Sequence, residues 1–178
     1  MRLAWAFLFA LCGSCALAAG TLNPADGTVF YGKHAFELLG TCSRESPQGV
    51  QGAWDPMPEQ ITALERALPQ ALADHIATHP RTRQALNNLV TAYADHEFVG
   101  YDRQYGGLLI GGRRLIYVNA FPHEERDFDG SDAMDFWRQG PDWRHHAMTV
   151  CDSGQKWFGV LYDPQTGRFE DFQFGGHL

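Results

Sequence analysis

The segment QYGGLLIGGRRLIYVNAF, residues 104–121, constrains the fold most, because its pattern is typical of two β-strands joined by a tight turn. Two apolar runs flank Gly111-Gly112, and a glycine pair permits the positive φ angles of a two-residue hairpin. The second run alternates in the period of a strand, with Ile116, Val118 and Ala120 on one face and Leu115, Tyr117 and Phe121 on the other.

Three more apolar runs follow, at residues 146–152, 156–163 and 168–174, and we predict a strand for each. The turn chemistry between the last two is specific. In Asp163-Pro-Gln-Thr-Gly167, proline presets the first corner and glycine can take the left-handed conformation at the end. The chain from Tyr101 onward is therefore predicted to be mainly β-sheet.

The preceding segment has helical periodicity. Its apolar stripe consists of Ile61, Leu64, Leu68, Leu72 and Ile76. Pro58 suits a first helical turn and Pro80 marks the end, whereas Pro69 should kink or divide the helix because it lacks an amide proton. Residues 81–98 carry a second, shorter amphipathic pattern.

Helices that precede hairpin-linked strands predict an α+β fold, with one or two helices packed on one face of an antiparallel sheet of four or five strands. We expect residues 58–178 to form this single domain. Residues 20–57 are rich in Gly, Pro, Ser and Thr. They are predicted to be an extended N-terminal arm with one or two short strands, held by Cys42.

The first 19 residues have the order of a secretory signal peptide: Arg2, then an apolar run, then small residues ending at Ala18-Ala19. The run is too short to span a bilayer, and no later segment is long enough, so no membrane span is expected. A buried N-terminal helix fits this order less well, and a lipoprotein acylated at Cys15 stays open. We expect a periplasmic or secreted protein.

Two cysteines, Cys42 and Cys151, lie beyond the predicted signal peptide. In an oxidising compartment they most simply form one disulfide, the alternative being two separate buried thiols. The chain has 14 Lys and Arg against 21 Asp and Glu, a formal net charge of −7. This balance argues against binding nucleic acid or anionic lipid, which clustered cations carry.

Ser153 lies in Asp152-Ser-Gly154, between two apolar runs, where these residue types are usual in a turn. A nucleophilic serine would also need a base, an orienting group and an oxyanion hole. Because the pattern supplies none of these, we interpret Ser153 as a turn residue and name no catalytic residue. An undetected hydrolase remains an alternative.

Five stretches carry a family resemblance: RQYGG (103–107), GRRLIYVNAF (112–121), VCDSG (150–154), WFGVLYDPQTGRF (157–169) and FGG (174–176). With them the chain resembles a widespread group of small exported proteobacterial proteins of unassigned function. It departs at Ser153-Gly154, where the group has Gly-Gly, and at Gly175-Gly176, where the group has Asn-Gly. The resemblance implies the fold and an exported protein, and it implies no mechanism.

The segment between Phe121 and Arg144 is the richest in functional groups. A calcium loop could use the carboxylates of Asp127, Asp129, Asp132 and Asp135 around a turn glycine, although the bidentate glutamate and full loop length are missing. The alternative is a solvated acidic loop that caps a short helix. A calcium-stabilised envelope module is therefore a second functional hypothesis.

The same segment holds aromatic residues that either pin it to the sheet or form a binding surface. We predict a surface for a protein partner, with a basic protein as the candidate, centred on Phe128, Asp129, Asp132, Trp137 and Trp143. His145-His146, with His123 upstream, have no spacing for a shared ion because neighbouring strand residues face opposite ways. No metal and no cofactor are expected. The leading hypothesis is an exported, non-catalytic envelope protein with an inhibitor or immunity-like role.

Overall fold

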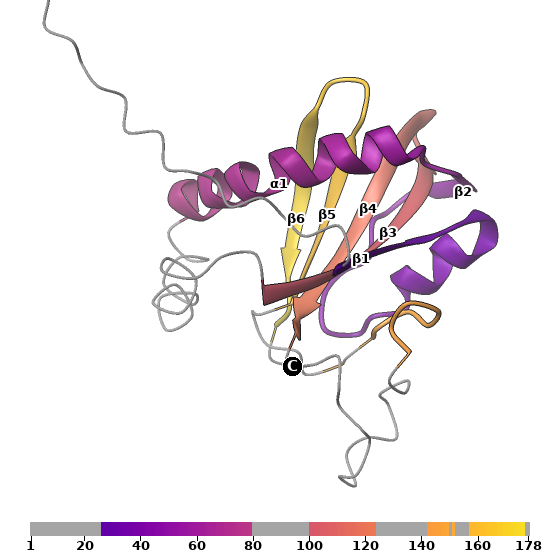
Figure 1. Cartoon of the computed structure of the whole chain (residues 1–178), viewed down its shortest axis with the longest axis horizontal. Helices are drawn as coiled ribbons and strands as arrows, with labels where there is room; N and C mark the ends of the chain where they lie inside the picture. The colour runs from indigo at the N-terminus through magenta and orange to yellow at the C-terminus, as the bar shows by residue number, and fades with distance from the viewer. Residues whose placement is uncertain (1–25, 80–99, 124–141, 150, 152–156, 177–178) are drawn as a thin grey trace, which may run out of the picture.

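The computed structural model describes residues 26–79, 100–123, 142–149, 151 and 157–176, and the fold is given for these residues. Figure 1 shows one twisted sheet with the long helix lying across it. The elements are β1 (Gly27–Phe30), the 3₁₀ helix η2 (Gly32–Leu39), β2 (Val50–Trp54), α1 (Pro58–Thr78), β3 (Tyr101–Ile110), β4 (Arg113–Pro122), β5 (Phe158–Asp163) and β6 (Arg168–Phe174).

The sheet has six strands in the order β1-β3-β4-β5-β6, and β2 also pairs with β3. Two elements of the predicted N-terminal arm therefore share one edge of β3. β1 pairs parallel with Arg103–Gly106, and β2 pairs antiparallel with Gly107–Ile110. The α+β class is confirmed, and the sheet differs from the prediction by being mixed and by one more strand than the upper count. The arm is part of the sheet because its short strands complete the hydrogen bonding of β3.

The two described helices cover opposite faces of the sheet. On the α1 face, Leu64, Leu68 and Leu72 are buried against a cluster that includes Ile116 and Val118. On the other face, Ala35 and Leu38 of η2 pack with Leu115, Tyr117 and Leu161. The predicted alternation of β4 is thus confirmed, and both faces are buried because each is covered by its own helix.

Helix α1 is continuous through Pro69, so the helix is not divided there, and that part of the prediction is wrong. The buried stripe extends from Leu64 to Leu72, on both sides of the proline. Packing of that stripe outweighs the one backbone hydrogen bond that proline removes. No helix in the described part of the chain has the length and apolar character needed to cross a bilayer. The predicted helix at 81–98 lies outside the described residues.

The predicted turns at Gly111-Gly112 and at 163–167 are confirmed. Ile110 faces Arg113 across a two-residue loop, in which Gly111 and Gly112 have φ angles of 57° and 77°. In the second turn, Gly167 has a φ of 70° and its amide donates to Asp163 O at 2.8 Å. These positive φ angles explain why glycine stands at each position.

The strand predicted at 146–152 is wrong for its described residues, since 146–149 are irregular. Side chains of the sheet bind this backbone instead of a neighbouring strand. Gln104 Nε2 donates to His146 O at 2.8 Å, Met148 N donates to Gln104 Oε1 at 2.9 Å, and Asn119 Nδ2 donates to Met148 O at 2.9 Å. The buried side-chain amides of Gln104 and Asn119 therefore make the hydrogen bonds to this backbone that a neighbouring β-strand would otherwise make.

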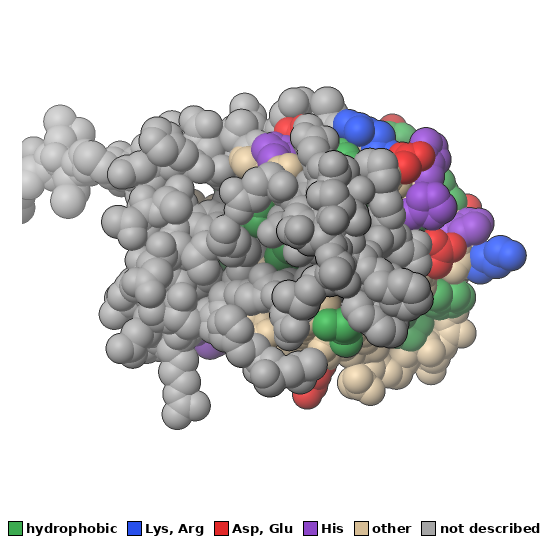
Figure 2. Space-filling model, turned by 90° about the horizontal axis from the view of Figure 1, so that it is seen from below, with side chains coloured by type: hydrophobic (Ala, Val, Ile, Leu, Met, Phe, Trp, Pro, Cys, Tyr) green, Lys and Arg blue, Asp and Glu red, His purple; other side chains and the backbone are tan. Residues whose placement is uncertain are grey.

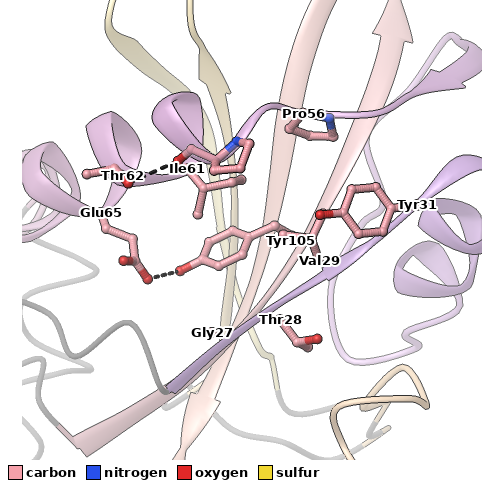
Figure 3. A pocket seen from close by; sticks show the side chains of 10 residues that line it. Gly27, Thr28, Val29, Tyr31, Pro56, Ile61, Thr62, Glu65 and Tyr105 are labelled. Carbon is pink, nitrogen blue, oxygen red and sulfur yellow. Dashed lines mark hydrogen bonds between the residues drawn. The ribbon is translucent and has the colours of Figure 1, made fainter.

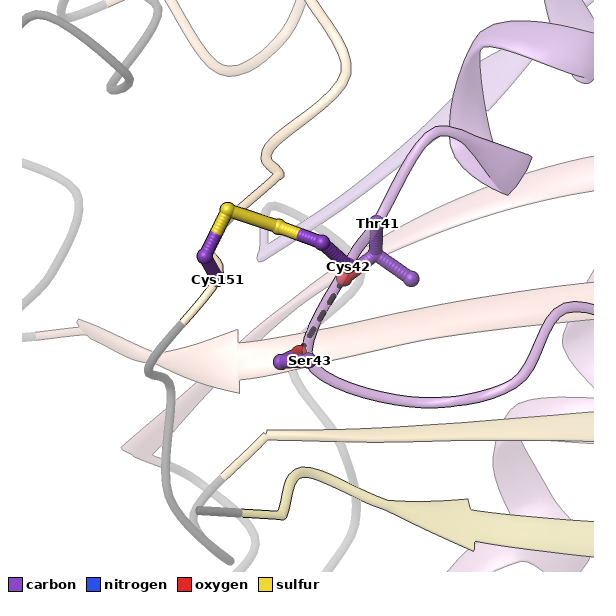
Figure 4. The surroundings of a disulfide bond; sticks show 4 residues. All are labelled: Thr41, Cys42, Ser43 and Cys151. Atoms are coloured by element: carbon purple, nitrogen blue, oxygen red, sulfur yellow. Dashed lines mark hydrogen bonds between the residues drawn. A yellow bond between two sulfur atoms is a disulfide. The ribbon is translucent and has the colours of Figure 1, made fainter. Parts of the chain in front are cut away.

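The disulfide between Cys42 and Cys151 is present, as the sequence predicts. It joins the chain after η2 to the segment that precedes β5 (Figure 4). The two cysteines are 109 positions apart, so the bond closes a loop that contains β2, α1, β3 and β4. It thereby anchors the N-terminal part of the fold to the C-terminal strands.

Replacing both cysteines by serine should lower the free energy of unfolding by about 4 to 5 kcal/mol, because a loop of this length restricts the unfolded chain strongly in the chain-entropy model. Denaturant unfolding of the oxidised wild type, the reduced wild type and the double variant measures the effect. The reduced wild type should match the variant. Equal stability of all three proteins would contradict the prediction.

Candidate functional site

Arg103 on β3 is completely buried and forms the centre of a polar cluster between the sheet and α1. Its Nε donates to Tyr105 Oη at 2.9 Å, and its Nη2 donates to Glu65 Oε1 at 3.3 Å. The Tyr105 hydroxyl also donates to Glu65 Oε1, at 2.7 Å. A buried guanidinium requires a nearby anion, and Glu65 of α1 supplies it.

A cavity of about 380 Å³ opens above this cluster, between α1 and the β1–β3 edge of the sheet (Figure 3). Most of its walls are apolar, and Glu65 and Tyr105 lie at one end. It is lined by Gly27, Thr28, Val29, Tyr31, Pro56, Pro58, Ile61, Thr62, Glu65 and Tyr105. A mainly apolar hollow of this size with a few polar groups is the usual form of a binding site.

The two oxygens of the Glu65 carboxylate have different surroundings. Oε1 accepts the hydrogen bonds from Tyr105 and Arg103, whereas no described residue donates to Oε2. The Glu65 side chain keeps 10% of its surface exposed and lines the cavity. Glu65 therefore presents one fixed oxygen and one oxygen that can accept a hydrogen bond.

Gly27 allows β1 to approach this cluster closely. A Cβ atom at that position would lie 2.9 Å from Tyr105 Cε2 and 3.2 Å from Glu65 Oε1. Gly27 is paired with Arg103 in the parallel register, so the backbone of β1 passes beside the buried guanidinium. The close approach forms one wall of the cavity, and a larger residue would displace Tyr105 or Glu65.

Burial raises the pKa of the Tyr105 phenol well above 10, and the charge of Glu65 and the hydrogen bond to it act in the same direction, while Arg103 opposes them. The phenol therefore stays protonated and continues to donate to Glu65. It is suited to holding the carboxylate in position and unsuited to acting as a base.

A second buried polar cluster lies on the η2 face of the sheet. Arg44 Nε donates to Tyr117 Oη at 3.2 Å, Arg44 Nη2 donates to Asn119 Oδ1, and Asn119 Nδ2 donates to Gln104 Oε1 at 2.9 Å. The sequence favours structural roles for Arg103, Tyr105, Tyr117 and Asn119. Their buried contacts agree with this, and Tyr105 in addition lines the cavity.

His123 at the end of β4 lies between two carboxylates that the sequence spacing did not reveal. Its Nδ1 is 3.2 Å from Asp102 Oδ2, and its Nε2 is 3.5 Å from Asp26 Oδ2. These three residues are a candidate metal-binding group by proximity. Each ring nitrogen of His123 faces a different carboxylate. We therefore interpret the group as a set of polar contacts that hold the ends of β1, β3 and β4 together.

Of the other predicted site residues, the structure describes only some. His145 is exposed and pairs with Asp142 at 2.7 Å. On the face seen in Figure 2, histidine, acidic and basic side chains are interspersed at the right-hand edge, so the described residues there form no patch of a single charge. Outside the described residues lie Phe128, Asp129, Asp132 and Trp137 of the predicted binding surface, the calcium candidates Asp127 and Asp135, and Ser153.

Trp143, by contrast, is 2% exposed and packs with Phe121, Met148 and Trp157. Its carbonyl accepts a hydrogen bond from Gln104 Nε2 at 2.6 Å. The prediction of Trp143 as an exposed contact side chain is therefore wrong. The residue anchors its segment to the sheet, which is the structural alternative for these aromatics.

A second, open groove of about 640 Å³ lies between the end of α1 and β6. His75 stacks on Phe172 there, and burial first, then the neighbouring His79, lower its pKa. None of the residues that line this groove is buried. It therefore lacks the fixed polar anchor that Glu65 gives the first cavity.

The chain matches no protein-family model, no curated protein and no solved structure among those compared with it. The resemblance to exported proteobacterial proteins therefore stays a prediction, and the case for function depends on the geometry of the cavity.

Removing the anion of the buried cluster should be strongly destabilising. Glu65→Ala leaves Arg103 buried without its carboxylate, so we expect the free energy of unfolding to fall by about 3 to 5 kcal/mol. Glu59→Ala, an exposed acid on the same helix, is the control and should cost less than about 1 kcal/mol. The double variant Glu65→Leu with Arg103→Met should recover much of the loss. A small effect of Glu65→Ala would contradict the assignment.

The raised pKa of Tyr105 predicts a loss of stability in alkali. Above about pH 10 an unfolded tyrosine loses its proton while folded Tyr105 keeps it, so the free energy of unfolding falls as pH rises. Unfolding by denaturant between about pH 9 and 11 should show a shallower fall in Tyr105→Phe than in wild type. Tyr31→Phe, at an exposed position, is the control. The same slope in all three proteins would refute the account.

Proposed function

We propose that this protein is a non-catalytic binding protein of the bacterial envelope, and that it holds a partner protein at the cavity between α1, β1 and β3. The observation that carries the proposal is the position of its exposed hydrophobic side chains. The large ones in the described part of the chain are Tyr31, Phe36 and Met57. Tyr31 lines the cavity, and Met57 lies between two prolines that line it. Exposed apolar residues around a hollow are typical of protein-binding sites.

The groups in the cavity support binding rather than catalysis. Tyr105 has a raised pKa and is fully buried, and Glu65 Oε1 is already shared by Arg103 and Tyr105. The described residues that line the cavity include no serine, cysteine, histidine or lysine. The cluster is organised to keep its shape, as a binding site requires.

An exported location is supported by two observations. The first 19 residues have the pattern of a signal peptide, and the disulfide requires an oxidising compartment to form and persist. These observations support a location in the periplasm or outside the cell. The resemblance to exported proteobacterial proteins points the same way.

The charge of the chain favours a basic partner. The formal net charge is −7, and such a charge steers a cationic protein toward its surface before contact. An inhibitor or immunity protein acts by binding another protein at a preformed site. We propose a role of this kind, in which the cavity supplies the specific contact and the negative net charge supplies the attraction.

The test is site-specific photocrosslinking in the organism that makes the protein. A photoreactive amino acid in place of Met57 should give a discrete protein adduct, whereas the same amino acid at exposed Gln165 in the β5–β6 turn should not. Adduct formation should weaken as salt rises, because a basic partner is steered by charge.

Two matched variants locate the contact. Thr62→Arg places a long side chain at the cavity wall and should abolish the Met57 adduct. Ala63→Arg adds the same charge at the next exposed position of α1, which does not line the cavity, and should preserve it. Loss of the adduct in both variants or in neither, or the absence of any adduct, would overturn the proposal.

A further inference from the structure

Building on the proposed function, we infer that the cavity receives an aromatic side chain of the partner that carries one neutral hydrogen-bond donor, as tyrosine and tryptophan do. Glu65 Oε2 accepts that hydrogen bond. The inference goes beyond the presence of a binding surface, because it states the chemistry of the group that enters the cavity.

The hydrogen-bonding groups of the cavity favour a bound group with a single hydrogen-bond donor. The Glu65 side chain lines the cavity and is 10% exposed. No described residue donates to its Oε2, while Oε1 accepts from Tyr105 at 2.7 Å and from Arg103 at 3.3 Å. The carboxylate cannot rotate to meet a ligand without breaking those bonds. One fixed acceptor at one end of a mainly apolar cavity selects a group with a single donor.

The charges of Glu65 and Arg103 favour a bound donor group that is electrically neutral. Arg103 is completely buried and already offsets the negative charge of Glu65. A lysine or arginine of the partner would place a second cation beside Arg103 in a poorly solvated space. A hydroxyl or indole N–H makes the bond with the carboxylate and adds no charge, so the site favours it over a cation.

The walls of the cavity favour a bound side chain whose body is apolar and compact. Val29, Ile61 and Pro56 face the space from β1, α1 and the segment before α1 (Figure 3). A volume of about 380 Å³ is at the lower end for binding sites, which suits one large side chain better than an extended peptide. Tyrosine and tryptophan combine an apolar body with a polar tip, and they dominate protein-binding hot spots.

The experiment uses three small probes of similar size on the full exported chain with its disulfide intact. They are p-cresol, which carries a neutral donor, toluene, which carries none, and 4-methylbenzylamine, which is a cation at neutral pH. Titrations are followed through the NMR signals of Val29 and Ile61. p-Cresol should bind about tenfold tighter than toluene, or more, because its hydrogen bond is to a charged acceptor. It should also bind tighter than the amine.

Two variants complete the design. Thr62→Arg should weaken binding of every probe, and Ala63→Arg should leave it unchanged. In the double variant Glu65→Leu with Arg103→Met, the preference for p-cresol over toluene should fall to about onefold, since the acceptor is gone. If that variant does not fold, the comparison of the three probes on wild type decides alone.

The outcomes separate this inference from the proposed function. Equal affinity for p-cresol and toluene, or tightest binding of the amine, would overturn the neutral-donor inference and leave the partner-binding proposal standing. Absence of binding by any probe would overturn the inference, and the Met57 adduct then decides the proposed function by itself. Retention of the p-cresol preference in the double variant would show that Glu65 is not the acceptor.

Discussion

The ion pair between Arg103 and Glu65 is the interaction on which the arrangement of α1 and the sheet depends. Arg103 has no exposure to solvent, so its charge must be offset within the protein, and Glu65 Oε1 lies 3.3 Å from its Nη2. Because the two residues belong to β3 and α1, the requirement fixes the rotation of the helix over the strand. Tyr105 adds a second donor to the same oxygen and keeps the carboxylate in one orientation.

The cavity follows from that arrangement. Glu65 occupies a helical position beside Leu64 and one turn after Ile61, so the charged group and the apolar wall lie on the same side of α1. Gly27 brings the β1 backbone close to Tyr105 and completes the opposite wall. The apolar stripe of α1 stabilises the fold, and its first turns, where the chain enters from Pro56, leave the hollow that we propose binds a partner.

The sequence predicts the elements with strong periodicity and clear turn chemistry, and it predicts little of the site. The stripe of α1 and the Gly111-Gly112 hairpin are local patterns, so both are confirmed. The pairing of the arm with β3, and the meeting of His123 with its two carboxylates, depend on contacts between distant residues, which no local pattern encodes. One signal for the site was available: Glu65 is a charged residue within the apolar stripe, and a buried acid calls for a buried cation.

A crystal structure of the full chain soaked with p-cresol tests the central claim most directly, because it reports both the place and the orientation of the bound group. The account predicts density for the ring between Ile61 and Val29, with the hydroxyl within hydrogen-bond distance of Glu65 Oε2 and the Arg103–Glu65 pair unchanged. A ring bound in the groove between α1 and β6, a hydroxyl turned away from Glu65, or an empty cavity at a concentration that saturates the protein in solution would contradict it.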